Sequence, residues 1–400
     1  MDWNTHFARM MGDATEMMYG THFLNATEAM QRVLIGAPLA LATPAIHCSP
    51  HSSLDVLEAL LPERQASAAA HPLEIEAPDS FQRVPIMVCG VLHHYWLYVP
   101  PGAAAETAEA AEAVEATADD ADDADAAEAD APMRMPLVMM LHGCSQEAKE
   151  FATATDMNRA AAAANANALV LYPEQARGAN PGGCWNWFEP ENQQRGQGEL
   201  GLMVAMLLDV MARHPVDAQR IYAAGISAGG AMAALLAREY PEMFAAIGVH
   251  SGLRAGAADN VMAALSAMNS GAKVGTSDTP PTHPSGAPQP ALIVFHGDAD
   301  TTVDAKNGEQ LVEAALQTAL GDKNAAFHET QQGQSNAGQR FTRHLYRAID
   351  RDEVLVEYWL LHNTGHAWSG GNPKVSQTDP KGASATQEML RFFLEHPQTH

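Results

Sequence analysis

The chain has 400 residues, an ordinary share of apolar residues (46%) and a formal net charge of −25. A chain of this length can hold more than one domain. Its acidic balance and lack of a basic patch argue against a nucleic-acid partner, because phosphates are contacted by clustered Lys and Arg. No apolar run approaches the roughly 20 residues that span a bilayer, and the N-terminus lacks the apolar core of a secretory signal. A cytoplasmic location is therefore expected, with secretion as the open alternative.

Residues 1–75 are predicted to form a small helical segment followed by a linker. The stretch that opens at Asn25 and ends at Gly36 has apolar residues at helical spacing, a polar N-cap and a terminal glycine. Residues 103–132 are rich in Ala, Asp and Glu and contain no aromatic residue, so they have little to bury. We expect this tract to be a disordered insertion in a surface loop.

Residues 82–397 are predicted to form one α/β domain. VPIMVCG and HHYWLYVP indicate a hairpin at a sheet edge. Buried strands are indicated by PLVMMLHG, ALVLYP, RIYAAG, AAIGVHSG, ALIVFHG and VLVEYWLLH. Amphipathic stretches between these runs predict helices, whereas SGAKVGTSDTPPTHPSGAPQP is typical of a loop. Strands that alternate with helices predict a mostly parallel, doubly wound sheet covered on both faces.

The stretch GISAG, residues 225–229, matches the pattern G-x-S-x-G between a predicted strand and a predicted helix. Gly225 and Gly229 would remove side chains where backbones approach closely, and Ser227 would project its hydroxyl from the turn. Ser227 is therefore a candidate nucleophile. The plainer interpretation is a small residue in a strand-to-helix turn.

A serine nucleophile needs a base that takes its proton and an acid that orients the base. In hydrolases with this motif the acid and then the base follow the serine along the chain. Asp298 and Asp300 follow one predicted strand, and His362 and His366 follow the last one. We favour Asp300 and His366, because Asp298 fits a turn former and His362 ends its strand.

The oxyanion of an acyl-transfer reaction needs hydrogen-bond donors. The backbone N–H of Ala228, directly after the serine, is one candidate, and the N–H of Cys144 in LHGCSQ is the other. His142 is expected to stabilise that loop. Four cysteines are too few for a disulfide scaffold, and a single bridge between Cys144 and Cys184 remains an open alternative.

Several aromatic residues flank these motifs. Trp185, Trp187 and Trp368 are candidates for a substrate pocket, and the alternative is that such aromatics pin their loops to the core. His250 and Ser251 in VHSGL are expected to form a structural pair. No metal ligation by cysteine is expected, since the cysteines show no CxxC pairing. No metal site and no cofactor are expected.

Together, several motifs give the chain a family resemblance. LHGCSQ, GGCWNWF, GISAGGAM, VHSGL, VFHGDADTTV and GHAWSGG resemble the polyhydroxybutyrate (PHB) depolymerase family of esterases, over residues 82–397. The resemblance implies an α/β-hydrolase fold, Ser227 as nucleophile, His366 as base and Asp300 as acid.

The resemblance also implies a substrate class. The expected reaction is hydrolysis of poly(3-hydroxybutyrate) or 3-hydroxyalkanoate oligomers through an acyl-enzyme. A carbohydrate esterase of the feruloyl or acetylxylan type is the alternative with the same site residues. A non-catalytic protein that binds polyester granules is the alternative from another class.

Overall fold

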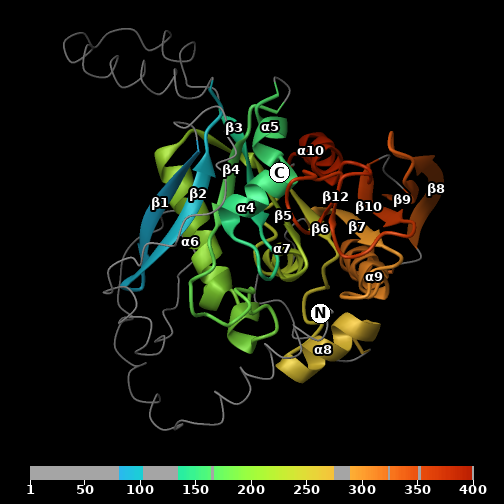
Figure 1. Cartoon of the computed structure of the whole chain (residues 1–400), viewed down its shortest axis with the longest axis horizontal. Coiled ribbons are helices and arrows are strands. Elements are labelled where there is room, and N and C mark those ends of the chain that lie inside the picture. Colours follow the sequence, from blue (N-terminus) through green and yellow to red (C-terminus); the bar gives the residue numbers. More distant parts are fainter. Residues whose placement is uncertain are drawn as a thin grey trace.

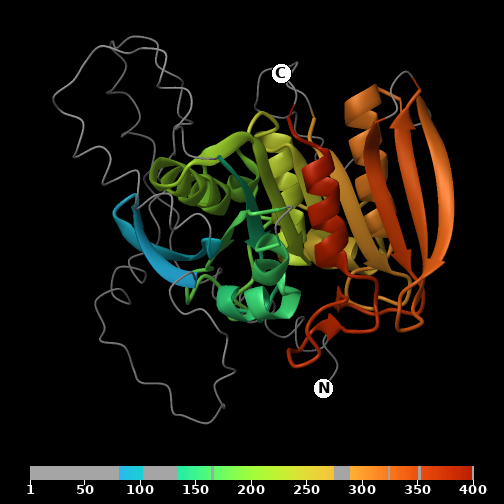
Figure 2. The same cartoon turned by 90° about the horizontal axis from the view of Figure 1, so that it is seen from above.

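The computed structural model describes residues 81–101, 134–163, 166–273, 289–322, 325–349 and 353–398. Within these ranges a ten-stranded sheet carries helices on both faces (Figure 1, Figure 2). The predicted helical segment 1–75, the acidic tract 103–132 and most of the predicted loop after residue 270 lie outside the described residues. The predicted α/β class with a mostly parallel sheet is confirmed.

The strands of the large sheet are not arranged in chain order. Across the sheet they lie as β1 (Phe81–Val88), β2 (Val91–Tyr98), β4 (Leu169–Pro173), β3 (Met135–Leu141), β5 (Val216–Ile226), β6 (Ala246–His250), β7 (Ala291–Gly297), β10 (Val354–Leu361), β9 (Arg340–Ala348) and β8 (Ala326–Gln334). The strands from β4 to β10 pair in parallel. The hairpin β1–β2 at one edge and the strands β9 and β8 at the other are antiparallel.

Two sets of helices cover the faces of the sheet, as the view in Figure 2 makes clear. One face carries α6 (Gly198–Arg213), α7 (Ala228–Glu239), α8 (Val261–Ser270) and α9 (Lys306–Leu320). The other face carries α4 (Ala148–Thr155), α5 (Met157–Ala161) and α10 (Ala385–Glu395). None of the helices in the described part of the chain is both long and apolar enough to cross a membrane.

The burial of β3 on both faces explains its continuous apolar sequence. Leu137, Met139 and Leu141 pack into the core beneath one set of helices, whereas Val138 and Met140 pack into the core beneath the other. Successive side chains of a strand point to opposite faces, so a strand covered on both sides needs apolar residues at every position. The central strands therefore form a rigid platform whose carboxyl ends hold the loops described below.

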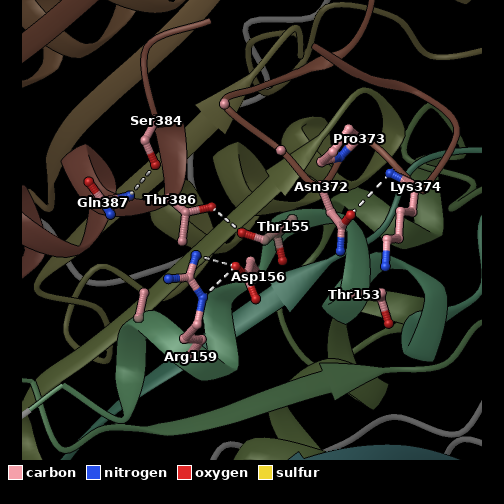
Figure 3. Close-up of a pocket in the computed structure, with 13 residues that line it drawn as sticks. Thr153, Thr155, Asp156, Arg159, Asn372, Pro373, Lys374, Ser384, Thr386 and Gln387 are labelled. Carbon is pink, nitrogen blue, oxygen red and sulfur yellow. Dashed lines mark hydrogen bonds and ion pairs between the residues drawn. The ribbon is translucent and has the colours of Figure 1, made fainter. Parts of the chain in front are cut away.

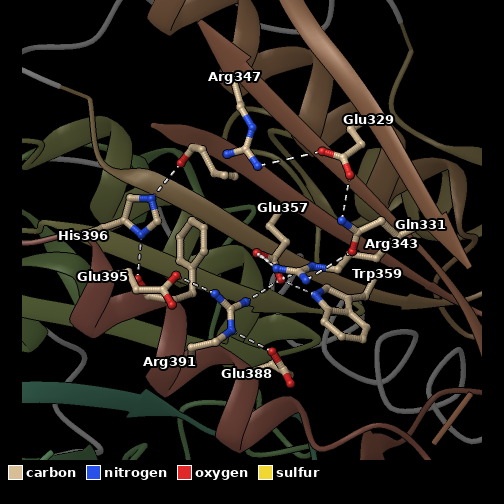
Figure 4. A network of polar contacts seen from close by, with 12 residues as sticks. Glu329, Gln331, Arg343, Arg347, Glu357, Trp359, Glu388, Arg391, Glu395 and His396 are labelled. Atoms are coloured by element: carbon tan, nitrogen blue, oxygen red, sulfur yellow. Dashed lines mark hydrogen bonds and ion pairs between the residues drawn. The ribbon is translucent and has the colours of Figure 1, made fainter. Parts of the chain in front are cut away.

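A buried carboxylate joins α10 to the sheet (Figure 4). Glu357 of β10 is 1% exposed and accepts hydrogen bonds from Arg343 of β9, from Arg391 of α10 and from the indole N–H of Trp359, at 2.7–2.9 Å. Two guanidinium groups compensate the buried charge, which would otherwise be strongly unfavourable. The network fixes α10 across β9 and β10.

Candidate active site

Ser227 lies at the sharp turn between β5 and α7. Its backbone has φ 56° and ψ −120°, a conformation that L-residues rarely adopt and that costs about 1–3 kcal/mol. A Cβ on Gly225 would lie 2.4 Å from the carbonyl carbon of Gly229, and one on Gly229 would lie 2.1 Å from the carbonyl oxygen of Leu141. Both glycines of the motif are thus required by backbone contact, and the turn presents Ser227 at the carboxyl end of the sheet.

Asp300 and His366 are hydrogen-bonded to each other, although they follow different strands. His366 Nδ1 donates to Asp300 Oδ2 at 2.7 Å, because a carboxylate can only accept. The other carboxylate oxygen accepts from the backbone N–H groups of Thr302 and Val303, both at 2.9 Å. The bond to Nδ1 leaves Nε2 of His366 as the free nitrogen of the neutral ring.

Asp300 is 8% exposed and its carboxyl is held in the ionised form. Burial alone would raise its pKa, but the hydrogen bond and charge of His366, the neighbouring His296 and the Val303 amide together lower the pKa below its usual range. The side chain is therefore a fixed negative charge beside the imidazole.

Ser227 and His366 line the same small pocket. The pocket walls come from the loops after β3, β5 and β10 together with a later turn, and the remaining lining residues are Gly143, Cys144, Gln146, Ile226 and Gln377. Sequence analysis missed Gln146, Ile226 and Gln377. Gln146 lies within the quoted motif LHGCSQ and could have been found there, whereas no sequence pattern marks Gln377.

The two alternatives that the sequence left open, Asp298 and His362, are paired with each other. His362 Nδ1 donates to Asp298 Oδ2 at 2.9 Å, and its Nε2 accepts from the hydroxyl of Thr342 at 2.8 Å. Asp298 also accepts from the backbone N–H of Asn363 at 2.6 Å. The pair therefore joins the ends of β7, β9 and β10. Because both ring nitrogens of His362 are hydrogen-bonded, neither is available to accept a proton from a nucleophile.

The loop after β3 leaves one amide available to the pocket. Gly143 N–H donates to Gln146 Oε1 at 2.8 Å, and Ser145 N–H donates to the carbonyl of Gly182 at 2.7 Å. Among the described residues no acceptor is found for the Cys144 N–H. Ala228 opens α7, where the first N–H groups of a helix have no intrahelical partner. The two predicted oxyanion donors, the N–H groups of Cys144 and Ala228, thus have no hydrogen-bond acceptor within the described residues.

A disulfide fixes the loop that carries this amide. Cys144 and Cys184 are bonded across a sequence separation of 40, the alternative that the sequence left open. His142 supports the same loop, as expected, with Nδ1 donating to the Gly143 carbonyl at 2.9 Å. The loop after β3, which contains Cys144, and the loop of GGCWNWF therefore form one covalently linked unit.

A carboxylate that has no basic partner among the described residues is hydrogen-bonded to this linked unit. Glu199 of α6 accepts from Gln175 Nε2 at 2.5 Å and from the backbone and side-chain nitrogens of Asn186, both at 2.7 Å, while Gln175 also donates to the Cys184 carbonyl at 2.8 Å. The residue retains some exposed surface, but its carboxylate is enclosed. Burial raises the pKa of Glu199 to about 7, and the hydrogen bonds from Gln175 and Asn186 oppose the rise.

The three tryptophans predicted as pocket candidates lie in the core instead. Trp185 and Trp368 are 0% exposed and Trp187 is 5% exposed, and none of them lines the pocket beside Ser227. Trp185 packs against His142 with ring centroids 5.2 Å apart, and the indole N–H of Trp368 donates to the Thr386 hydroxyl. The alternative interpretation, that these aromatics pin their loops, describes what the structure shows.

A larger cavity of about 530 Å³ lies beyond the loop that follows His366 (Figure 3). Its walls are the ends of α4 and α5, the start of α10 and residues 370–374. Arg159 and Asp156 form an ion pair on its wall, and Thr386 donates to the Thr155 carbonyl at 2.6 Å. Neither Ser227 nor His366 lines it. The two cavities share no lining residue among the described parts of the chain, so this cavity is distinct from the pocket beside Ser227.

The strand-turn-helix at Ser227, followed along the chain by Asp300 and His366 at the ends of later strands, defines the α/β-hydrolase class. The chain belongs to the esterase PHB depolymerase family, whose family model matches residues 125–327.

Curated relatives are similar in sequence to this chain, and a solved structure shares its fold. A poly(3-hydroxyalkanoate) depolymerase C from Paucimonas lemoignei is 31% identical over 241 residues, 59% of this chain and 55% of the relative. A feruloyl esterase B from Thermothelomyces thermophilus is 34% identical over 125 residues, 31% of this chain and 41% of the relative. The chain thus spans about half the length of these relatives. The structure of an acetyl xylan esterase from Aspergillus awamori shares the fold, with a TM-score of 0.53, 17% identity and coverage of 76% of this chain and 94% of that one.

Proposed function

We propose that the protein is a serine esterase that hydrolyses ester bonds of 3-hydroxyalkanoate oligomers or amorphous poly(3-hydroxybutyrate). The observation that carries the proposal is the 2.7 Å hydrogen bond from His366 Nδ1 to Asp300, with His366 and Ser227 lining one pocket. The relation to a poly(3-hydroxyalkanoate) depolymerase C supports the substrate class.

The proposed reaction has two halves. Ser227 Oγ attacks the ester carbonyl while His366 Nε2 takes its proton, and the oxyanion is bound by the N–H groups of Cys144 and Ala228. The tetrahedral intermediate then expels the alcohol oxygen, which receives the proton from His366. In the second half a water molecule gives a proton to His366 and attacks the acyl-enzyme, and His366 returns this proton to Ser227 Oγ as the acid is released. Asp300 stabilises the imidazolium in both halves.

A carbohydrate esterase is the second candidate, favoured by the relation to a feruloyl esterase B. Side-by-side kcat/KM on a 3-hydroxybutyrate oligomer and on methyl ferulate decides between the two, with Ser227→Ala as the blank. Preference for the oligomer supports the polyester function, and preference for the ferulate moves it to carbohydrate esters. Retained hydrolysis in Ser227→Ala would overturn the mechanism. A wild-type protein that neither turns over esters nor reacts with a fluorophosphonate would instead favour the non-catalytic granule-binding alternative.

The Cys144–Cys184 disulfide also bears on location. Structural disulfides persist in oxidising compartments and are rare in the reducing cytosol. This bond favours an oxidising compartment over the cytoplasmic location expected from the sequence. Fractionation of the native host, with the thiols alkylated before analysis, tests the point: the oxidised protein should be found outside the cytosol.

A further inference from the structure

His250, at the end of β6, contacts two parts of the candidate site with different atoms. Its backbone carbonyl accepts from the N–H of Ser227 at 3.0 Å. Its Nε2 accepts from the N–H of Ser369 at 3.0 Å, and Ser369 lies three residues after His366. One residue of the central sheet thus joins the nucleophile turn to the loop that carries the base.

The neighbouring Ser251 extends this contact to the acid. Its backbone N–H donates to the carbonyl of Phe295 at 2.8 Å, and Phe295 belongs to β7, whose following turn carries Asp300. His250 and Ser251 are both 0% exposed. Together they contact the strand or loop that carries each of the three candidate catalytic side chains.

The hydrogen bonds of His250 fix its tautomer. An amide N–H can only donate, so Nε2 must offer its lone pair to Ser369, and the ring proton lies on Nδ1, from which it donates to Ser251 Oγ at 3.1 Å. Phe295 and Trp368 stack on the ring, with centroids 5.9 and 5.2 Å away. Burial and the nearby His296 and His366 lower the pKa of His250 to about 3, which keeps the ring neutral.

The contact to Ser369 secures one flank of His366. On the other flank the Ala299 N–H donates to the Thr364 carbonyl at 3.2 Å, which attaches residues before His366 to the end of β7. After His366, the Trp368 N–H donates to the Gln377 carbonyl and the Asn372 N–H to the Ala154 carbonyl, both within the outer loops and helices. The bond from Ser369 to His250 attaches this second flank to the central sheet.

We propose that His250 is a positioning residue that holds the loop after His366 against β6 and thereby sets the position of the base relative to Ser227. The inference rests on the proposed serine esterase function, which it deepens. A displacement of about 1 Å in a catalytic group can cost on the order of 100-fold in rate. The role requires an acceptor at the Nε2 position, not merely a ring that fills the space.

Three substitutions separate these requirements. His250→Phe keeps an aromatic ring between Phe295 and Trp368 but removes the acceptor. In His250→Gln the terminal amide falls near the place of Nε2, so its oxygen can accept from Ser369, whereas in His250→Asn the shorter amide falls near the place of Nδ1. Tyr222→Phe is the matched control, because it removes a buried hydroxyl of the adjacent strand β5 that has no hydrogen-bond partner among the described residues.

The expected result is a loss of kcat on the order of 100-fold in His250→Phe with little change in KM. His250→Asn should resemble it, His250→Gln should recover most of the loss, and Tyr222→Phe should match the wild type. The low-field proton NMR signal of the His366 Nδ1–H bonded to Asp300 should weaken in the Phe and Asn variants and persist in the Gln variant. Thermal unfolding identifies variants that fail to fold, and if His250→Phe does so, the comparison of Gln with Asn decides.

Wild-type kcat in folded His250→Phe, or equal kcat in the Gln and Asn variants, would overturn the proposal. The NMR signal does not depend on any substrate. A wild-type protein without esterase activity would therefore contradict the proposed function, while the response of the signal to the three substitutions would still decide the role of His250.

Discussion

Asp298 and Asp300 lie two residues apart on one turn, yet their carboxylates hold different histidines: Asp298 pairs with His362 at 2.9 Å and Asp300 pairs with His366 at 2.7 Å. Only the second histidine lines the pocket that contains Ser227. The turn after β7 thus supplies one pair that joins strand ends and one pair that faces the candidate nucleophile.

This division predicts unequal effects of the same substitution. Asp300→Asn should lower kcat by about 10,000-fold, because an amide in place of the carboxylate favours the wrong tautomer of the base. Asp298→Asn should change kcat by less than about 10-fold and act mainly on stability. Steady-state kinetics with the preferred ester, accompanied by thermal unfolding of both variants, makes the comparison. Equal losses of kcat would contradict the assignment of the acid.

Gln146 is predicted to hold the loop after β3 in place by accepting a hydrogen bond from the Gly143 N–H. Gln146→Ala should lower kcat, though by less than the roughly 100- to 1,000-fold that follows outright loss of an oxyanion donor. Gln146→Glu retains an acceptor at the same place and is the matched control, expected to exceed Gln146→Ala in kcat. Equal losses of kcat in the Ala and Glu variants would contradict a contribution of the Gly143 hydrogen bond to catalysis.

The Cys144–Cys184 disulfide is predicted to contribute mainly to stability. A crosslink across a sequence separation of 40 should stabilise the fold by about 2–4 kcal/mol, chiefly through the unfolded chain. The double substitution of both cysteines by alanine should lower the free energy of unfolding by that amount, measured in urea without reductant. It should leave substantial activity, because the proposed donor at Cys144 is a backbone amide. An unchanged urea midpoint would argue against the crosslink as a stabilising element.

Glu199 predicts a pH dependence of stability with a definite sign. Its pKa is about 7 in the folded protein against an ordinary 4.5, so the folded state favours the protonated form. The stabilisation from that form is complete below about pH 4.5 and is lost as the pH rises through about 7, with a total of about 3 kcal/mol. Glu199→Gln removes this titration. The free energy of unfolding of the wild type minus that of Glu199→Gln should therefore fall between pH 5 and pH 8.

Urea titrations of both proteins at several pH values measure this difference. A difference that stays constant from pH 5 to pH 8 would show that Glu199 titrates at its ordinary pKa.

Sequence patterns predicted the central strands well because those strands are buried on both faces. The apolar runs that became β3, β4, β5, β6, β7 and β10 are continuous, and the predicted hairpin at a sheet edge became β1 and β2. The same patterns missed β8 and β9. The sequence AFHETQQGQ of β8 is largely polar and exposed, so its strand structure depends on pairing with β9 rather than on its own composition.

The candidate site was predictable where the backbone geometry demands a particular residue type, as it demands glycine at positions 225 and 229. It was less predictable where a side chain's partner comes from a distant part of the chain. Whether Asp298 or Asp300 reaches His366 is decided by how the turn after β7 meets the loop after β10, which no local pattern encodes. The tryptophans were ambiguous for a related reason. An aromatic loop residue can face solvent or core with the same sequence, and here the core packing of Trp185 and Trp368 decides.

The polar composition that hides β8 from sequence patterns also bears on self-association. β8 is the outermost strand of the sheet, and its outer edge could in principle template another chain into a growing aggregate. The glutamine, glutamate and histidine side chains of β8 are polar, and most of the strand is exposed to water, which disfavours pairing of this edge with another chain. Glu329 also places a charged side chain on this edge strand. Replacing these residues with valine or isoleucine would increase the strand propensity of β8. The same change would turn the sheet edge into an aggregation-prone apolar strand.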